Sequence, residues 1–263
     1  MRLCTYNVHG WADADGRSNT ERVCDLLCAL DCDVVMLNEV LTNTGQLARI
    51  AEELSLYRGI AAAGGMLGNA LLSKTPLIDQ EFVTLTAGYG EVRSGMVASV
   101  AMDDPRVTVC ATHLDHRHED DRLKQLKKLL KELSAREGDA TVIGGDFNAL
   151  RLTDYDREAL NGVRAVRAKN HWEAPRDDVI DHMDRAGWID AFRLARAGSL
   201  DRYDATLGDA LAPEGLASCW IGTRIDYFWL PRASLDRVKV TRCERVESDA
   251  SDHYPVVLEI TAV

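Results

Sequence analysis

Carboxylate, carboxamide and imidazole side chains recur along this chain at the ends of short apolar runs. The most informative cluster is Ser251-Asp252-His253, which stands directly before the last apolar run of the sequence. A carboxylate beside an imidazole can bind a metal ion or transfer a proton. Polar residues occupy the same kind of position at Asn7, Glu39, His113, Asp146 with Asn148, and Asp226. Polar groups that recur at the ends of β-rich runs are typical of an active site built on a sheet.

The elements that would position these residues are interleaved strands and helices, without an internal repeat or a low-complexity linker. Helices are predicted from residue 18 or 19 to about residue 30 and at residues 44–54. The clearest amphipathic helix is predicted at residues 119–136, closed by Gly138. Strands are predicted at residues 2–6, 34–37, 69–73, 82–86, 97–102, 107–112, 142–145, 227–230, 238–241 and 256–260.

Many short strands with a few helices outside them indicate two packed sheets flanked by helices, in an α/β (α+β) fold. A hairpin turn is predicted at Asp103-Asp104-Pro105-Arg106. Residues 151–218 have weak helical patterns and little strand character, so we interpret them as an elaboration between the two halves. The aromatic residues of this segment, Trp172, Trp188 and Tyr203, either pack in a core or stack on a substrate.

Length and composition are those of an ordinary globular protein, with 263 residues, 46% hydrophobic and 28% charged. No apolar run approaches the roughly 20 residues that span a bilayer, and no signal peptide precedes the first predicted strand. We therefore expect a cytoplasmic protein. Its seven cysteines are expected to be reduced thiols. Cys24, Cys28 and Cys32 could bind a metal, although small buried hydrophobic residues are the simpler interpretation.

The formal net charge of −11 argues against broad, nonspecific binding to long nucleic acids. It does not exclude a phosphate substrate, because a divalent cation bound among the acidic residues would reverse the local field. Basic residues cluster at residues 122–131 and 157–169. A solvated helix face is the simpler interpretation of the first cluster.

Six sequence segments, in this order, resemble those of the endonuclease/exonuclease/phosphatase superfamily, the deoxyribonuclease-like metal-dependent phosphoesterases. The segments are Thr5-Tyr6-Asn7, Leu37-Asn38-Glu39-Val40, Thr112-His113-Leu114, Gly144-Gly145-Asp146-Phe147-Asn148, Arg224-Ile225-Asp226-Tyr227 and Ser251-Asp252-His253. The resemblance covers most of the chain. It implies a single domain over residues 1–263 that forms a four-layer α/β/β/α sandwich of two packed, mostly antiparallel sheets.

Metal-assisted hydrolysis of a phosphodiester is the activity that the resemblance implies. Such a reaction needs neutralised phosphoryl oxygens, an activated water in line with the leaving group, and stabilisation of the leaving oxygen. Mg²⁺ is the implied cofactor, with Mn²⁺ as a substitute, because Mg²⁺ prefers hard oxygen ligands. The resemblance assigns Glu39 as the principal metal carboxylate, with Asn7 and Asp252 beside the metal or its waters.

The resemblance also implies roles for the remaining polar residues. Asp146 would orient or deprotonate the attacking water, and Asn148 would donate to the phosphate. His253 would contact the scissile phosphate and transfer a proton, while Asp226 fixes its tautomer. His113 resembles a histidine that donates to a phosphoryl oxygen in the deoxyribonuclease and tyrosyl-DNA phosphodiesterase branches. Taken singly, each residue has a structural interpretation, as a turn former, a surface carboxylate or a core histidine.

Departures from the family pattern bear on the substrate. His9 stands where abasic endonucleases usually carry an Asp, and Asn38 stands where Gln is common. Asp115, Arg224 and Trp220 are the candidates for substrate contacts.

Three functions remain open from the sequence. The first is a metal-dependent phosphodiesterase acting on a nucleic-acid end or a nucleotide-like diester, near the 5′-tyrosyl-DNA phosphodiesterase branch. The second is a phosphoesterase of the same fold acting on a phospholipid, an inositol phosphate or another small metabolite. The third is a non-catalytic binding module. The oligomeric state is not decided by the sequence.

Overall fold

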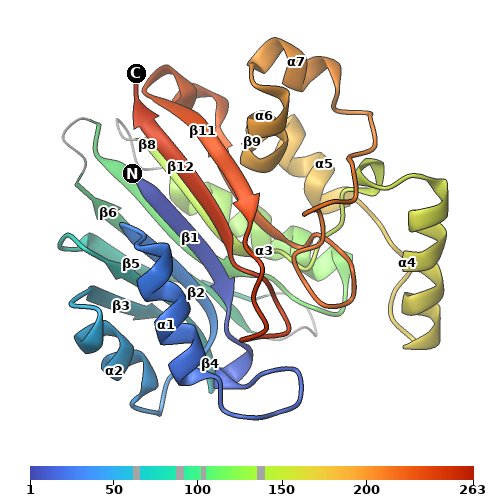
Figure 1. Ribbon diagram of the computed structural model, residues 1–263. Helices are drawn as coiled ribbons and strands as arrows, with labels where there is room; N and C mark the ends of the chain where they lie inside the picture. Colours follow the sequence, from blue (N-terminus) through green and yellow to red (C-terminus); the bar gives the residue numbers. More distant parts are fainter. Residues whose placement is uncertain (62–65, 87–91, 102–104, 135–139) are drawn as a thin grey trace.

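The computed structural model describes residues 1–61, 66–86, 92–101, 105–134 and 140–263, which form two packed sheets with helices outside them (Figure 1). The strands are β1 (Arg2–Asn7), β2 (Val34–Leu41), β3 (Tyr57–Ala61), β4 (Leu67–Ser73), β5 (Ile78–Leu85), β6 (Arg93–Val100), β7 (Val107–His113), β8 (Ala140–Asp146), β9 (Trp188–Asp190), β10 (Asp226–Pro231), β11 (Val238–Arg245) and β12 (Val256–Ala262). The helices are α1 (Thr20–Leu30), α2 (Gln46–Glu53), α3 (Glu119–Ser134), α4 (Arg157–Lys169), α5 (Asp178–Arg185), α6 (Ala191–Ala197) and α7 (Leu200–Ala205).

Each sheet has six strands, in the orders β11-β12-β1-β2-β4-β3 and β5-β6-β7-β8-β10-β9. Among the described strand pairs, only β1 with β2 and β7 with β8 are parallel. Each parallel pair is joined by a crossover that contains a helix, α1 in the first sheet and α3 in the second. The four-layer, mostly antiparallel sandwich expected from the sequence is therefore confirmed.

The parallel pairs bring the polar strand ends together. In the first sheet Asn7 at the end of β1 pairs in register with Asn38 in β2, one residue before Glu39. In the second sheet His113 at the end of β7 pairs with Asp146 at the end of β8. Asp226, the first residue of the antiparallel strand β10, pairs with Asp146 from the other side. The two sheets thus present their polar residues at the same end of the sandwich.

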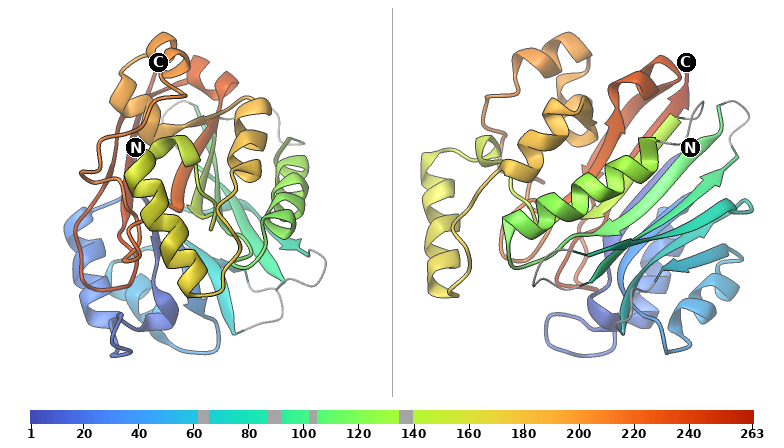
Figure 2. Two further views of the ribbon diagram at one scale, coloured as in Figure 1. Left: turned by 90° about the vertical axis from the view of Figure 1, so that its right-hand side faces the viewer. Right: turned by 180° about the vertical axis from the view of Figure 1, so that it is seen from behind.

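Three apolar clusters hold together the sheets and helices whose layers Figure 2 shows from two further sides. The central cluster lies between the sheets, where Met36 and Leu71 of the first meet Met96, Val109 and Phe228 of the second. A second cluster packs α1 and α2 on the first sheet, and a third packs α3 and α5 on the second. Helix α4 stands out from the body at one side (Figures 1 and 2).

Two adjacent glycines in β8 allow the close approach of neighbouring atoms just before Asp146. A Cβ on Gly144 would lie 2.5 Å from Met36 Sδ of the facing sheet. A Cβ on Gly145, whose φ is +155°, would lie 1.8 Å from the carbonyl oxygen of Thr112 in β7. Only glycine adopts this backbone conformation without strain, so Gly145 is required for the pairing that places Asp146 beside His113.

Most of the predicted elements are present, with shifted ends. Strand β3 was not predicted, and β6 begins at Arg93 instead of residue 97. Residues 102–104, 136 and 138 lie outside the described residues, so the predicted turn at residues 103–106 is described only in part and the predicted closure of α3 by Gly138 is not described. The lysines of the basic cluster in α3 are exposed, as predicted, whereas Arg122 is buried against Glu119.

Residues 151–218 form α4 to α7 and the three-residue strand β9. Trp188 and Tyr203 in this segment are buried, whereas Trp172 is 45% exposed. All seven cysteines are free thiols. Cys24 and Cys32 are buried and Cys28 is exposed. Among the described residues, every helix is too short or too polar to span a bilayer.

The requirement for glycine at position 145 can be tested by substitution. We expect Gly145→Ala to lower the free energy of unfolding by at least about 2 kcal/mol, because both the contact with Thr112 and the positive φ are incompatible with a Cβ. Gly162→Ala is the matched control, since Gly162 lies in α4 with nothing within 4 Å of its added Cβ. This control should be stabilised by about 0.5–1 kcal/mol. Urea unfolding that gave both variants the same stability would contradict the assignment.

Candidate active site

A cavity of about 460 Å³ lies at the end of the sandwich where the polar strand ends meet. Most of the residues singled out from the sequence line it: Glu39, His113, Asp146, Asn148, Trp220, Asp252 and His253. Asn7 and Asp226 are buried and hydrogen-bonded to members of this group. Arg224 and Asp115 do not line the cavity.

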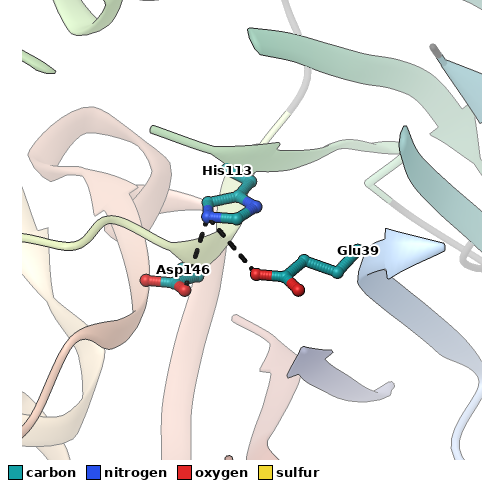
Figure 3. A group of neighbouring side chains, drawn as sticks. All are labelled: Glu39, His113 and Asp146. Atoms are coloured by element: carbon teal, nitrogen blue, oxygen red, sulfur yellow. Dashed lines mark ion pairs between the residues drawn. The ribbon is translucent and has the colours of Figure 1, made fainter. Parts of the chain in front are cut away.

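One half of the site joins the two sheets through Asn7, Glu39 and Asp146. The Asn7 amide Nδ2 donates to Glu39 Oε1 at 3.0 Å and to Asp146 Oδ2 at 3.1 Å. His113 Nε2 lies 4.0 Å from Glu39 Oε1 and 3.6 Å from Asp146 Oδ2 (Figure 3). A carboxylate from each sheet and an imidazole therefore converge on one point.

The other half is a buried histidine with a carboxylate behind it. His253 Nδ1 is 2.8 Å from Asp226 Oδ2, and His253 Nε2 is 3.7 Å from Asp146 Oδ2. Ser218 holds Asp226 in place, because its hydroxyl donates to Asp226 Oδ2 at 2.7 Å and accepts from the Asp226 backbone N–H at 2.9 Å. His253 thus stands between two carboxylates, with Nδ1 facing Asp226 and Nε2 facing Asp146.

Burial and neighbouring charges shift the acidities of these groups. Burial, together with the Asp226 carboxylate, raises the pKa of Asp146 to about 7, although His253 opposes this shift. Burial alone would lower the pKa of His253, but Asp226 and then Asp146 raise it well above the usual value. Burial and the Arg93 guanidinium hold the pKa of His113 well below its usual value. Titratable groups with divergent acidities in one cavity are typical of an active site.

Two site residues have left-handed backbone conformations. Glu39 has φ of +56°, at a register shift in the pairing of β2 with β4, and Asn148 has φ of +49°. Asn adopts this conformation readily, whereas Glu does so rarely. The irregular pairing re-aims the Glu39 side chain, and strain of this kind concentrates at functional sites.

A buried network of amides ties the two sheets together behind Asp146. The backbone N–H of Asp146 donates to Asn38 Oδ1 at 3.0 Å. Asn38 Nδ2 donates to Asn69 Oδ1 at 2.7 Å and to the Thr112 carbonyl at 2.9 Å. Asn69 in turn donates to the Ser94 carbonyl at 2.7 Å. Asn38, noted in the sequence only as a departure from the family pattern, therefore fixes the backbone that carries Asp146.

The geometry does not support substrate contacts by Arg224 or Asp115. Arg224 is buried and donates to Asp154 Oδ2 at 2.8 Å and to Asp190 Oδ2 at 2.7 Å, so its charge is satisfied inside the protein. Asp115 is buried and accepts from the backbone N–H groups of Arg117 and His118, before α3. Trp220, by contrast, is 67% exposed and lines the cavity.

Several cavity residues were not assigned to the site from the sequence. Arg93 stands at the start of β6, and its Nη1 atom is 3.3 Å from His113 Nδ1. His116 and Arg167 also line the cavity, as does Trp172. His9 lines it with its Nδ1 atom 3.7 Å from Asp252 Oδ1. Residues 93–96 lack an apolar alternation, so the strand was predicted to begin only at residue 97. Arg93 was therefore not recognised as a residue at a strand end.

The donor set fits a divalent cation. The carboxylates of Glu39, Asp146 and Asp252 line one cavity, and Asp226 lies directly behind it. Asp226 Oδ1 is buried without a hydrogen-bond partner. Burial, together with the neighbouring Asp226 carboxylate, raises the pKa of Asp146, and a hard cation would offset both effects.

The contrasting environments of Arg224 and Trp220 can be tested by truncation. We expect Arg224→Ala to destabilise the fold by about 3–5 kcal/mol, because it removes the guanidinium that bonds both Asp154 and Asp190 and leaves these buried carboxylates with fewer partners. Trp220→Ala removes an exposed side chain and should change the free energy of unfolding by less than about 0.5 kcal/mol. Denaturant titrations compare the two variants, and an Arg224→Ala protein of unchanged stability would restore Arg224 as a candidate substrate contact.

The chain is similar in sequence and in fold to known phosphoesterases. It is 29% identical over 165 residues to tyrosyl-DNA phosphodiesterase 2 of Xenopus laevis, a match that covers 60% of this chain and 43% of that protein. The chain thus spans less than half the length of the curated relatives that it matches.

Solved structures share the fold over the full chain. An endonuclease/exonuclease/phosphatase from Beutenbergia cavernae superposes with a TM-score of 0.72 at 21% identity, covering 100% of this chain and 71% of that one. The human Nocturnin catalytic domain with bound sulfate gives 0.71 at 17% identity, covering 100% and 94%. Tyrosyl-DNA phosphodiesterase 2 of D. rerio, complexed with a single-strand DNA product, gives 0.69 at 16% identity, covering 99% and 98%.

The family model for the Endonuclease/Exonuclease/phosphatase family matches residues 4–253, which include every polar residue that lines the cavity. The protein therefore belongs to this family of hydrolases.

Proposed function

We propose that the protein is a divalent-metal-dependent phosphodiesterase that cleaves a phosphodiester at a nucleic-acid end or in a nucleotide-like substrate. The observation that carries this proposal is the convergence of Glu39, Asp146, His113 and His253, from strand ends of both sheets, on one cavity. The family match supplies the reaction class. The grouping of carboxylates and imidazoles around one cavity supports the proposal, because phosphodiester hydrolysis requires a metal ligand, a base for the water and donors to the phosphate.

Glu39 is the proposed principal ligand of Mg²⁺, with Mn²⁺ as its substitute. Asn7 donates to the Glu39 carboxylate and so fixes its direction, and Asp252 lines the same cavity. The Ser251 hydroxyl donates to the carbonyl of Asn7 at 2.8 Å, and its oxygen lies 3.3 Å from Asp252 Oδ1. The bound cation would neutralise phosphoryl oxygens and stabilise the leaving oxygen.

Asp146 is the proposed base for the attacking water. Its Oδ1 accepts the backbone N–H of Asn148 at 2.9 Å, which leaves Oδ2 directed at the point where His113 and His253 converge. A carboxylate whose pKa is near 7 accepts a proton more readily than an ordinary aspartate does. A bound cation would lower that pKa, so the cation and burial together would determine the pKa of Asp146 during the reaction.

The two histidines and Asn148 are the proposed stabilisers of charge on the phosphoryl group. His253 is held by Asp226 through Nδ1, so the Nε2 nitrogen of His253 is available to the substrate. His113 and Asn148 lie side by side, with Asn148 Nδ2 3.0 Å from His113 Nε2. Donors already held around the phosphate would stabilise the developing charge without having to reorganise.

The cavity walls favour a nucleic-acid end over a small metabolite. Trp220 and Trp172 both line the cavity and are exposed, and aromatic faces of this kind stack on bases. Arg167 of α4 adds positive charge beside Trp172, although the net charge of the chain is −11. An acidic protein with a small basic wall suits a short single-stranded end better than a long duplex. The 29% identity to a tyrosyl-DNA phosphodiesterase supports this choice.

Because all seven cysteines are free, we also propose a reducing, cytoplasmic setting.

The role of Asp146 is tested by replacing its proton acceptor. We expect Asp146→Asn to lower kcat by about 10² to 10⁴ with the fold retained, since this is the usual effect of removing one positioned base. The substrates are 5′-tyrosyl and unmodified single-stranded DNA, RNA, abasic duplex, bis-(p-nitrophenyl) phosphate and inositol phosphates. Asp25→Asn, an exposed change on α1, is the matched control and should retain full activity.

The substrate panel separates the remaining functions. Preference for a DNA or RNA end supports the proposal, whereas preference for an inositol phosphate assigns the protein to the small-metabolite alternative. Full activity of Asp146→Asn on the preferred substrate would contradict the mechanism. A wild-type protein that binds these compounds without cleaving them would be a binding module.

The metal assignment is tested by a direct binding measurement. We expect Glu39→Gln to weaken Mn²⁺ binding by at least about tenfold in calorimetric titration, because a carboxylate ligand becomes a neutral amide. Glu52→Gln, an exposed change on α2, serves as the matched control. Chelation should abolish turnover of the wild-type protein, and added Mg²⁺ or Mn²⁺ should restore it. Equal Mn²⁺ affinity in both variants would remove Glu39 from the metal site.

A further inference from the structure

Arg93 contacts two histidine rings at the edge of the cavity. Its Nη1 atom is 3.3 Å from His113 Nδ1 and its Nη2 atom is 3.1 Å from His116 Nδ1. The antiparallel pairing of β6 with β7 explains the contact, because Ser94, next to Arg93, pairs in register with His113. His113 is buried, whereas His116 is exposed.

The contact with Arg93 limits the hydrogen positions on the His113 ring. A guanidinium group carries five N–H donors, has no acceptor, and stays charged at every pH of interest. A nitrogen atom that accepts a hydrogen bond from Arg93 must therefore present a lone pair. In a neutral imidazole the second nitrogen then carries the hydrogen. For His113, this places the hydrogen on Nε2.

Asn148 makes a competing demand on the same ring. As assigned, Asn148 Nδ2 lies 3.0 Å from His113 Nε2 and 3.3 Å from the Leu114 carbonyl, so it would donate to both. A neutral ring cannot accept from Arg93 at one nitrogen and from Asn148 at the other. The carboxamide can exchange its nitrogen and oxygen by turning, whereas the guanidinium has no such alternative. Turning Asn148 allows His113 Nε2–H to donate to Asn148 Oδ1, at the cost of replacing the hydrogen bond to the Leu114 carbonyl with a contact between two oxygen atoms about 3.3 Å apart.

Two carboxylate oxygens, which are acceptors, also lie near His113 Nε2. Asp146 Oδ2 is 3.6 Å away and Glu39 Oε1 is 4.0 Å away. Both carboxylates favour a ring nitrogen that bears hydrogen over one that presents a lone pair. The groups around His113 therefore agree on one tautomer once Arg93 is taken as the fixed donor.

We propose that Arg93 is a positioning residue that holds His113 in the Nε2–H tautomer, so that Nε2 donates into the cavity toward a phosphoryl oxygen. The donation to a phosphoryl oxygen rests on the proposed function, whereas the tautomer does not. The same arrangement releases the Asn148 amide N–H groups from His113, so they are available to the substrate. Arg93 thus sets the hydrogen-bond direction of a short chain that runs from Arg93 through His113 to Asn148.

The tautomer can be measured in the metal-free protein, independently of activity. Correlation spectra of ¹⁵N-labelled histidine distinguish the two neutral tautomers, and the His113 signal is assigned by comparison with His113→Gln. We expect the wild-type protein at mildly alkaline pH to show His113 with hydrogen on Nε2. Arg93→Met, which keeps the aliphatic stem and removes the donor, should shift His113 from the single Nε2–H pattern to a mixture of the two tautomers, because Asn148 can then donate to Nε2 while Asp146 and Glu39 still favour hydrogen there. His116→Gln, which retains the contact between Arg93 and His113, should keep the wild-type pattern.

Three results would overturn the proposal: hydrogen on Nδ1 in the wild-type protein, an unchanged Nε2–H pattern in Arg93→Met, or an equal change in His116→Gln. The wild-type spectrum decides the first result even when Arg93→Met fails to fold, which circular dichroism shows. Kinetics add a second readout: kcat of Arg93→Met on bis-(p-nitrophenyl) phosphate should fall by about tenfold or more, with a smaller change in KM. If the wild-type protein hydrolysed none of the substrates, the proposed function would be wrong. The spectra would still test the tautomer of His113, because they do not depend on activity.

Discussion

The buried carboxylate of Asp146 is the constraint on which the rest of the site depends. An ionised group in the interior is costly unless hydrogen bonds and opposite charges surround it. Asn148 donates its backbone N–H to one oxygen of Asp146, Asn7 donates to the other, and His253 stands nearby. These partners come from different strands and loops of both sheets. The position of Asp146 therefore determines how the sheets meet at this end of the sandwich.

The surrounding structure accepts local strain to meet that constraint. Gly145 lies against the Thr112 carbonyl in a conformation that other residues avoid, and Glu39 has a positive φ at an irregular point of β2. The buried amides of Asn38 and Asn69 occupy space that apolar side chains would otherwise fill. Such buried polar groups reduce the stability of the fold unless they are fully hydrogen-bonded. The apolar cores on both sides of each sheet offset the free-energy cost of holding them.

The ordered polar segments made the fold and most of the site predictable from the sequence. Asn7, Glu39, His113, Asp146 and His253 could be singled out because each follows or precedes an apolar run. Arg224 could not be placed, because its partners Asp154 and Asp190 are 70 and 34 residues away and only the folded chain brings them together. Arg93 was missed because β6 begins with residues that carry no strand pattern. The positive φ of Glu39 could not be foreseen, because glutamate is not typical of that conformation.

The pairing of the last strand, β12, with the first, β1, also has a consequence for how the protein is made. His253 stands just before β12, and the hydroxyl of the neighbouring Ser251 contacts the backbone of Asn7, which lies 244 positions earlier in the chain. The histidine therefore reaches its place only after the ribosome has passed residue 253. Contacts over such long sequence separations form late and slowly in folding. Any partly synthesised chain that stops before residue 253 thus lacks a complete form of the proposed hydrolytic site.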